Sequence, residues 1–269
     1  ELCPQLVFVG GHFKDYQRLG GAVIEMIGEY TPLVERISID EAFADVAACT
    51  HLFGEPAEIA RTIRERVRRE LGLPISVGVA RTKHLAKTAS QVAKPDGLVV
   101  VDPDSELAFL HDLPVELMWG VGPVTQARLA ASGITSIGQL ARTSAESLER
   151  LVGSAASAKL GALAWNCDPR EIQTRRRSHS GGAQSALVGK PADERVYRPV
   201  LAHRGDRIAT RLRDKPLVGR PVTARVRFAD LRSITRSTTL AAPIAATASL
   251  TEVAAELVRA ALSDHPEEG

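Results

Sequence analysis

Two adjacent carboxylates, Asp40 and Glu41, stand in a segment otherwise suited to a β-sheet, ERISIDEAFADV at residues 35–46. At about 4 Å two like charges repel by about 1 kcal/mol in water and by about 4 kcal/mol at an effective dielectric near 20. The pair must therefore be solvated, turned apart or neutralised by a cation. Carboxylates at a sheet edge suit Mg²⁺, which accepts sites built from few side chains, waters and substrate phosphates. A metal site and a plain solvated pair both stay open, and Asp193 with Glu194 forms a second such pair.

Three lysines follow in the segment RTKHLAKTASQVAKPDG at residues 81–97. Lys94 stands immediately before Pro95, where a helix is expected to end, and a lysine at such an edge can reach a triphosphate. Lys83 and Lys87 fall on or beside the same helix. Lys87 has apolar neighbours, so its stem can equally lie over the core.

The segment WGVGP at residues 119–123 has a different physical basis. Gly120 and Gly122 flank Val121, and Pro123 suits the first turn of a helix. Backbone N–H groups at a helix N-terminus bind an anion without help from a side chain, and a short connection between helices is the alternative. With the later Gly-Ile-Thr at 133–135, the pattern is typical of a helix-hairpin-helix unit that grips a nucleic-acid backbone.

Four arginines occupy two predicted strands near the end of the chain. Arg225 and Arg227 share one face of their strand by the period of two, and Arg232 and Arg236 likewise share a face of theirs. Such spacing suits a row of phosphates, and an ordinary polar sheet face is the alternative.

The first hundred residues alternate between strand and helix patterns. Strands are predicted at 6–10, 32–39, 42–46, 74–80 and 97–101, and helices at 14–30, 59–71 and 82–93. This order implies a sheet with helices packed on one face. It also places the two carboxylates in the turn of a hairpin.

After residue 103 the chain contains a helical region, a basic tether and a second region with both helices and strands. Residues 104–168 show short helical patterns without a convincing strand, and 169–186, with Arg175, Arg176 and Arg177, is basic and poor in apolar side chains, as a tether is. From residue 190 a helix, two strands and a helix are predicted. Residues 171–236 hold 16 Lys or Arg against six Asp or Glu, which suits a polyanion partner or, alternatively, a solvated arginine-rich surface.

Composition excludes several classes of protein. With 269 residues, two or three domains are expected. No apolar run approaches the roughly 20 residues that cross a bilayer, so we expect a soluble, cytoplasmic protein without a membrane partner. The three cysteines are spaced for neither disulfides nor zinc, and the absence of GxSxG and P-loop motifs argues against a hydrolase or an NTPase.

Four ordered segments resemble the Y-family translesion DNA polymerases, in particular the bacterial DNA polymerase IV or DinB type. They are SIDEAFADV at 38–46, SVGVARTKHLAKTASQVAKPDG at 76–97, LPVELMWGVGPVTQARLAASGITSIGQL at 113–140 and RVRFADLRSITRSTTL at 225–240. The resemblance extends over nearly the whole chain. Four motifs in this order are specific, whereas any one alone would not be.

The resemblance implies an α+β multidomain fold. A partial polymerase palm with a ferredoxin-like sheet would occupy 1–102, an all-α helix-hairpin-helix thumb 103–168, a basic linker 169–184 and an α/β little-finger DNA-binding domain 185–269. It further implies that Asp40 and Glu41 ligate Mg²⁺, that Glu41 is catalytic and that Lys94 contacts the triphosphate. The DNA contacts would come from Gly120, Val121 and Gly122 and from Arg225, Arg227, Arg232 and Arg236.

The sequence also departs from the family pattern. Family members begin with a strand bearing an aspartate and two aromatics, followed by a fingers region, and Glu1 stands downstream of these features. Asp15 is not in a matching motif, and neither a final strand nor the clamp-docking tail follows HPEEG at 265–269. We therefore expect a fragment or a degenerate copy whose two-Mg²⁺ site is incomplete and whose activity alone is low.

Three functions follow from these interpretations. The first is an error-prone translesion DNA polymerase with primer-template DNA, deoxynucleoside triphosphates and the family's sliding clamp as partners. The second is a non-catalytic DNA-binding or accessory remnant, against which the retained pair of carboxylates argues. The third is a nucleotide cyclase with a palm-like sheet, which would not explain the helix-hairpin-helix motif or the basic C-terminal region.

Overall fold

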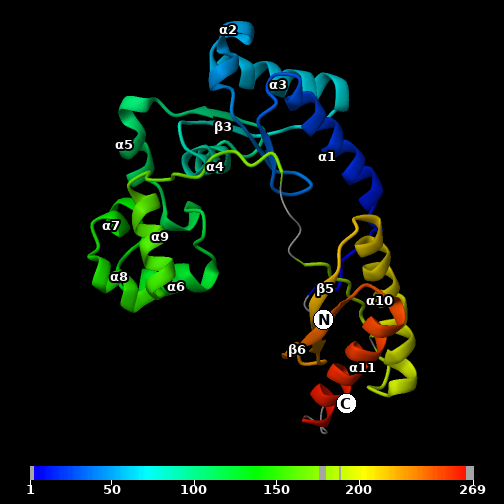
Figure 1. Ribbon diagram of the computed structural model, residues 1–269. Helices are drawn as coiled ribbons and strands as arrows, with labels where there is room; N and C mark the ends of the chain where they lie inside the picture. Colours follow the sequence, from blue (N-terminus) through cyan, green and yellow to red (C-terminus); the bar gives the residue numbers. More distant parts are fainter. Residues whose placement is uncertain (1–2, 176–179, 188, 265–269) are drawn as a thin grey trace. The chain divides into compact units, whose positions relative to one another are not determined.

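The computed structural model describes residues 3–175, 180–187 and 189–264. The chain divides into two compact units, Glu1–Arg176 and Arg177–Gly269, which Figure 1 shows in sequence colours. This boundary falls inside the predicted linker, whose Arg176 and Arg177 lie outside the described residues, as does the HPEEG end. The finer division into palm, thumb, linker and little finger stays a prediction. Along the described chain, no helix has the length and apolar character needed to cross a membrane.

The first part of unit 1 contains most of the predicted elements. They are α1 (Phe13–Gly28), β1 (Val34–Arg36), β2 (Ala42–Ala44), the 3-10 helix η1 (Ala47–Cys49), α2 (Thr50–Phe53), α3 (Pro56–Leu71), β3 (Val77–Val79), α4 (Lys83–Val92) and β4 (Leu98–Val100). Helix α3 begins with a capping box between Glu55 and Glu58 and ends at Gly72, which takes the left-handed conformation expected of a stop glycine.

The predicted single sheet is instead two short pairs of strands. β1 and β2 form the expected antiparallel hairpin, whereas β3 and β4 pair in parallel. The predicted strand at 6–10 is wrong. That segment has no strand structure, and Val7, Phe8 and Val9 are 78% to 90% exposed. An apolar run becomes a strand only where a neighbouring edge accepts its hydrogen bonds, and no described strand pairs with it.

Two glycines allow the close packing that positions the site. A Cβ at Gly78 in β3 would lie 2.1 Å from the carbonyl oxygen of Ala86, so only glycine lets α4 lie this close to the strand. A Cβ at Gly20 in α1 would lie 2.2 Å from the carbonyl oxygen of Ile39. Helix α1 therefore supports the turn that carries Asp40 through direct contact with its backbone.

The second part of unit 1 is helical, as predicted. Its elements are the 3-10 helices η2 (Pro103–Ser105) and η3 (Val115–Leu117) and the helices α5 (Glu106–His111), α6 (Pro123–Ala131), α7 (Ile137–Ala141), α8 (Ala145–Val152) and α9 (Ser154–Ala164). Helices α6 to α9 lie together in Figure 1. One apolar core joins these helices to α4, whose Leu85 and Ala89 are fully buried in it. The two parts of unit 1 therefore share a core.

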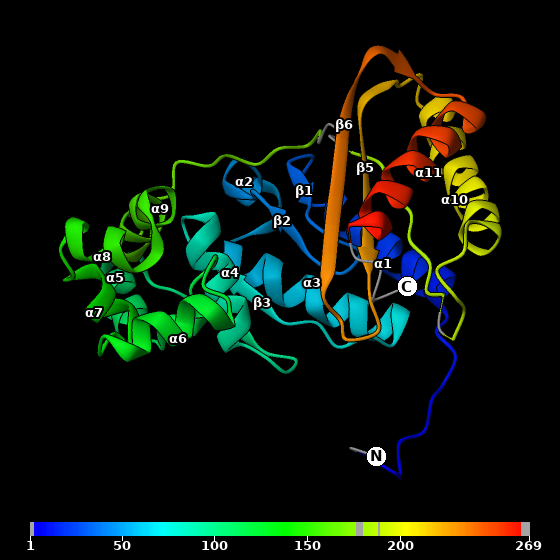
Figure 2. The same cartoon turned by 90° about the horizontal axis from the view of Figure 1, so that it is seen from below.

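Unit 2 is an antiparallel pair of strands covered by two helices. Its elements are α10 (Glu194–Asp214), β5 (Gly219–Arg227), β6 (Ser233–Ile244) and α11 (Thr247–Ser263). Helices α10 and α11 lie on one side of the strands in Figure 2, and Ala224 and Val226 point toward them from the buried face. Among the described residues of unit 2, no helix lies over the opposite face of this sheet.

Candidate functional site

The turn between β1 and β2 presents Asp40 and Glu41 to solvent. The carbonyl oxygen of Glu41 accepts hydrogen bonds from the backbone N–H groups of Ile37 at 2.9 Å and Ser38 at 3.2 Å, which closes the turn. Both carboxylates belong to exposed residues. The hairpin prediction is confirmed, and the turn places Asp40 and Glu41 at one end of the strand pair.

The two carboxylates have different partners. The hydroxyl of Ser38 donates a hydrogen bond to Asp40 at 2.5 Å. Glu41 accepts a hydrogen bond from the ammonium of Lys87 on α4, with 2.6 Å between Oε1 and Nζ. The repulsion expected between adjacent carboxylates is thus relieved on the Glu41 side by a lysine of the same unit.

These two residues alone do not make a complete metal centre. Carboxylate oxygens are the right donors for Mg²⁺. Among the described residues, however, no group of three or more His, Cys, Asp or Glu side chains is placed to hold a metal ion. One oxygen of Glu41 already contacts the ammonium of Lys87.

An aromatic residue that sequence reasoning did not single out connects this turn to the helical part. The indole of Trp119 lies with its ring centre 5.7 Å from Nζ of Lys87 and 4.0 Å from the guanidinium carbon of Arg170. Phe43, two residues after Glu41, lies 5.7 Å from the same indole, ring centre to ring centre. Trp119 belongs to the WGVGP segment, so this segment contacts Lys87 of α4 and Phe43 of β2, which lie next to Glu41.

Lys83 and Glu35 form a buried ion pair beneath the turn. Their side chains are 9% and 10% exposed, and Nζ lies 2.5 Å from Oε2 of Glu35. The same carboxylate oxygen accepts the backbone N–H of Gln173 at 2.7 Å, and Lys83 donates to the carbonyl of Glu171 at 3.2 Å. The pair thereby ties β1 and α4 to the segment that follows the helices. Lys83 was noted in the sequence, but its partner lies 48 positions away and no local pattern indicates it.

Asp168 and Arg170 form a second polar group on this segment. Asp168 is bonded by both Nε and Nη2 of Arg170, at 2.5 Å and 2.7 Å, and accepts the backbone N–H of His84 at 2.9 Å. Burial opposes ionisation of Asp168, yet these hydrogen bonds hold its pKa below the usual value. The ion pair holds Arg170 against the face of Trp119.

His84, next to Lys83 on α4, is a further buried titratable group. Its side chain is fully buried, and neither ring nitrogen has a hydrogen-bond partner among the described residues. Burial lowers the pKa of His84 from 6.5 to about 4, although the charge of Asp168 opposes the shift. The imidazole is therefore neutral at pH 7.

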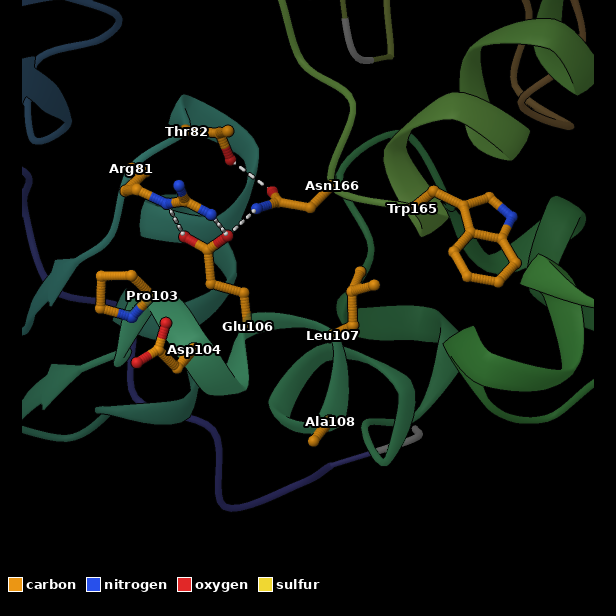
Figure 3. A pocket seen from close by; sticks show the side chains of 9 residues that line it. All are labelled: Arg81, Thr82, Pro103, Asp104, Glu106, Leu107, Ala108, Trp165 and Asn166. Carbon is orange, nitrogen blue, oxygen red and sulfur yellow. Dashed lines mark hydrogen bonds and ion pairs between the residues drawn. The ribbon is translucent and has the colours of Figure 1, made fainter.

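A cavity of about 490 Å³ lies beside the first turn of α4, lined by Arg81, Thr82, Pro103, Asp104, Glu106, Leu107, Ala108, Trp165 and Asn166 (Figure 3). Arg81 donates two hydrogen bonds to the buried Glu106, at 2.9 Å and 2.6 Å, and these hold the pKa of Glu106 below its usual value. Asn166 donates to the same carboxylate at 3.0 Å and accepts from Thr82 at 2.5 Å. The network joins α4 to both ends of the helical part.

Lys94 lies beyond the end of α4, before the cis peptide bond to Pro95. It is exposed, and it has no ion-pair partner within the part of the chain that the structure describes. Its ammonium is available to a ligand, and its predicted role toward a triphosphate stays a prediction.

The WGVGP segment begins α6 as expected. Gly120 has a φ of 108°, a conformation that favours glycine, and Gly122 is the N-cap residue with Pro123 in the first turn. The N–H of Val121 is already bonded to the carbonyl of Met118 at 3.0 Å. Of the three residues predicted to bind a backbone phosphate, Gly120 and Gly122 keep amides without a partner in the described chain.

The four arginines predicted to contact DNA do not share one face of the sheet in unit 2. Arg225 pairs across the strands with Thr235, and Arg227 with Ser233, on the face without helices. Arg236 pairs with Ala224 on the helix-covered side and contacts Asp264. Arg232 precedes β6 and contacts Asp230 in the connecting turn. Strand parity explains why Arg225 and Arg236 lie on opposite faces. Arg236 pairs with Ala224, and Ala224 is adjacent to Arg225 in β5, so the two face opposite sides.

Solved structures share this fold. A Y-family DNA polymerase chimera built from Dbh and Dpo4 superposes with a TM-score of 0.87 at 24% identity, covering 98% of this chain and 76% of that one. An insertion ternary complex of Dbh DNA polymerase gives a TM-score of 0.65 at 24% identity, covering 99% and 76%. The fold is therefore that of the Y-family DNA polymerases.

Sequence comparison narrows this class. Residues 1–91 match the impB/mucB/samB family, 187–267 match its C-terminal domain and 103–134 match the IMS family HHH motif. DNA polymerase IV 2 of Mesorhizobium japonicum is 68% identical over 268 residues, which are 100% of this chain and 65% of the relative. DNA polymerase IV of Halorhodospira halophila is 35% identical over 92% of this chain and 69% of the relative. The chain belongs to the DNA polymerase IV family.

Proposed function

We propose that this chain carries part of the catalytic centre, and the DNA-binding surfaces, of an error-prone translesion DNA polymerase. The observation that supports this most strongly is the hairpin turn that presents Asp40 and Glu41 in a chain of the DNA polymerase IV family. The chain spans 65% of the length of its Mesorhizobium relative, so the activity of the whole enzyme is part of the proposal.

In this proposal the residues have distinct tasks. Asp40 and Glu41 are ligands for divalent metal ions, which in polymerases stabilise the attacking and leaving oxygens of the displacement. Lys94 contacts the triphosphate of a deoxynucleotide, and the amides at Gly120 and Gly122 contact the primer-template backbone. The carboxylate pair needs further donors for a two-metal site, so we expect the chain alone to extend a primer weakly or not at all.

Primer extension tests this function directly. The chain is assayed alone, and again in a chimera in which it replaces the matching 268 residues of the Mesorhizobium relative. We expect extension only by the chimera. Glu41→Gln in the chimera should reduce the rate by more than about 100-fold. Removing a metal ligand should cost more than removing one of the ligand's outer hydrogen-bond partners, whose loss costs up to about 100-fold.

The matched control is Glu25→Gln, which removes an exposed carboxylate of α1 remote in sequence from the turn. It should leave the rate of the chimera unchanged. Robust extension by the chain alone would contradict the incomplete site, and an unaffected Glu41→Gln chimera would contradict the role of Glu41.

The open face of the β5 and β6 sheet supports the DNA-binding part of the proposal. Besides Arg225 and Arg227 it carries five hydroxyl side chains, those of Thr223, Ser233, Thr235, Ser237 and Thr239. Arginines and hydroxyls bind phosphate oxygens without reading the base sequence. A double variant, Arg225→Gln with Arg227→Gln, should weaken duplex binding and lower the slope of log affinity against log salt by about 1.8, at about 0.9 per phosphate.

Fluorescence anisotropy with labelled duplex DNA over a range of NaCl concentrations measures that slope. The control, Arg195→Gln with Arg207→Gln, removes the same charge from exposed positions of α10. Equal slopes for the two double variants would show that net charge, rather than this face, determines binding.

A non-catalytic DNA-binding protein is the second candidate. It is favoured by the lack of a three-carboxylate cluster among the described residues. A chimera that binds primer-template DNA but never extends it would support this alternative.

A further inference from the structure

The ion pair between Glu41 and Lys87 places an ammonium against a carboxylate that the proposed function requires as a metal ligand. Nζ lies 2.6 Å from Oε1, and the Lys87 side chain is 24% exposed while that of Glu41 is 45% exposed. The contact spans 46 positions of the chain, so tertiary packing creates it. In the described structure the charge next to Glu41 is an ammonium.

Lys87 is held from both sides. Its helix is fixed in the core by Leu85 and Ala89, which are fully buried. Its ammonium also lies 5.7 Å from the ring centre of Trp119, within the range of a cation–π contact. Trp119 is itself held against Arg170 at 4.0 Å. The ammonium thus has two attractive neighbours, a carboxylate and an aromatic face.

A divalent cation and an ammonium repel each other, so both bind one carboxylate poorly at the same time. We propose that Lys87 is the resident counter-cation of Glu41: a divalent metal ion competes with its ammonium for the carboxylate, and Trp119 retains the displaced ammonium. The inference rests on the proposed function, because it takes Glu41 as a metal ligand. It adds a positioning role for Lys87 and Trp119. Without metal, Lys87 offsets the repulsion between Asp40 and Glu41 and keeps the turn ordered.

Metal binding tests the competition without DNA or nucleotide. Mn²⁺ binding to the full chain is followed by the electron paramagnetic resonance signal of the free ion. Lys87→Met should bind Mn²⁺ about two- to five-fold more tightly, because an exposed ion pair no longer has to be broken. Lys87→Arg keeps the charge and should restore affinity to within a factor of two of the original chain.

Trp119 gives a second, independent measurement. The chain has two tryptophans, so Trp165→Phe leaves Trp119 as the only indole. In that background Mg²⁺ should change the emission of Trp119 as the ammonium moves on its ring. Adding Lys87→Met should abolish the change while Mn²⁺ still binds.

The outcomes separate the two proposals. Suppose that Glu41→Gln weakens Mn²⁺ binding but Lys87→Met leaves it unchanged or weakens it. That result would overturn the proposed competition and leave Glu41 as the proposed metal ligand. Mn²⁺ affinity that Glu41→Gln does not reduce would overturn both. If bound Mg²⁺ does not change the fluorescence emission of Trp119, the role proposed for Trp119 is wrong.

Discussion

Glu35→Gln is expected to destabilise unit 1 by about 3 kcal/mol or more. The substitution keeps the size of the side chain but removes its charge, so the ammonium of Lys83, 9% exposed, loses its carboxylate. Breaking one side of a buried ion pair typically costs about 3 to 5 kcal/mol, because the remaining charge stays out of water. Among the described residues, that ammonium keeps its contacts with the carbonyl of Glu171 and the ring of Phe43.

Urea unfolding followed by tryptophan fluorescence measures this loss in the right part of the chain. Trp119 and Trp165 both belong to unit 1, so the signal does not report on unit 2. Lys87→Met is the matched control, since it removes a charge from the same helix at a partly exposed ion pair, and it should cost less than about 1 kcal/mol. The double variant with Glu35→Gln and Lys83→Met should recover most of the loss. A single variant as stable as the control would show that the pair is not needed.

Acidification is expected to lower the unfolding free energy of unit 1 by about 3 kcal/mol less in His84→Leu than in the original chain. The pKa of His84 is about 4 in the folded chain and 6.5 in the unfolded chain, so the unfolded chain takes up the proton first. The stability from the neutral imidazole is complete above pH 6.5. It is lost as the pH falls from 6.5 to 4 and does not fall further below pH 4.

The charged groups that act on His84 are Asp168, Arg170 and Lys159. The pKa of Asp168 lies below its usual value of 3.8, so its titration falls below the window of His84. The difference in unfolding free energy between the original chain and His84→Leu, at several pH values between 7 and 4.5, therefore isolates the histidine. His51→Leu, at an exposed position of the same unit, is the control. Parallel curves for the original chain and His84→Leu would contradict the buried neutral imidazole.

Local patterns predicted the elements that the site needs but not their long-range contacts. The two extended runs on either side of Asp40 and Glu41 predicted the hairpin, because turn and strand signals lie within a few residues. The strand period of two placed Arg225 with Arg227 on one face. The 6–10 strand failed because its hydrogen-bond partners are not a local property.

The contacts that give the site its chemistry come from segments far apart in the chain. Lys87 meets Glu41 because Gly78 lets α4 approach β3 and because the shared core fixes the other face of α4. Glu35 sits in a strand whose pattern gave no reason to expect a buried lysine. Trp119 was considered only as part of a glycine motif, whereas its indole is what contacts Lys87 and Arg170.

The core that α4 shares with the helices after residue 103 restricts how this chain can be recombined. A graft that exchanges residues 103–168 with those of a distant relative would cut through buried contacts at Leu85 and Ala89 rather than through a surface. Such a hybrid needs α4 to be exchanged together with the helices it packs against. The boundary between the two compact units lies instead between Arg176 and Arg177, so a hybrid joined there leaves this shared core intact.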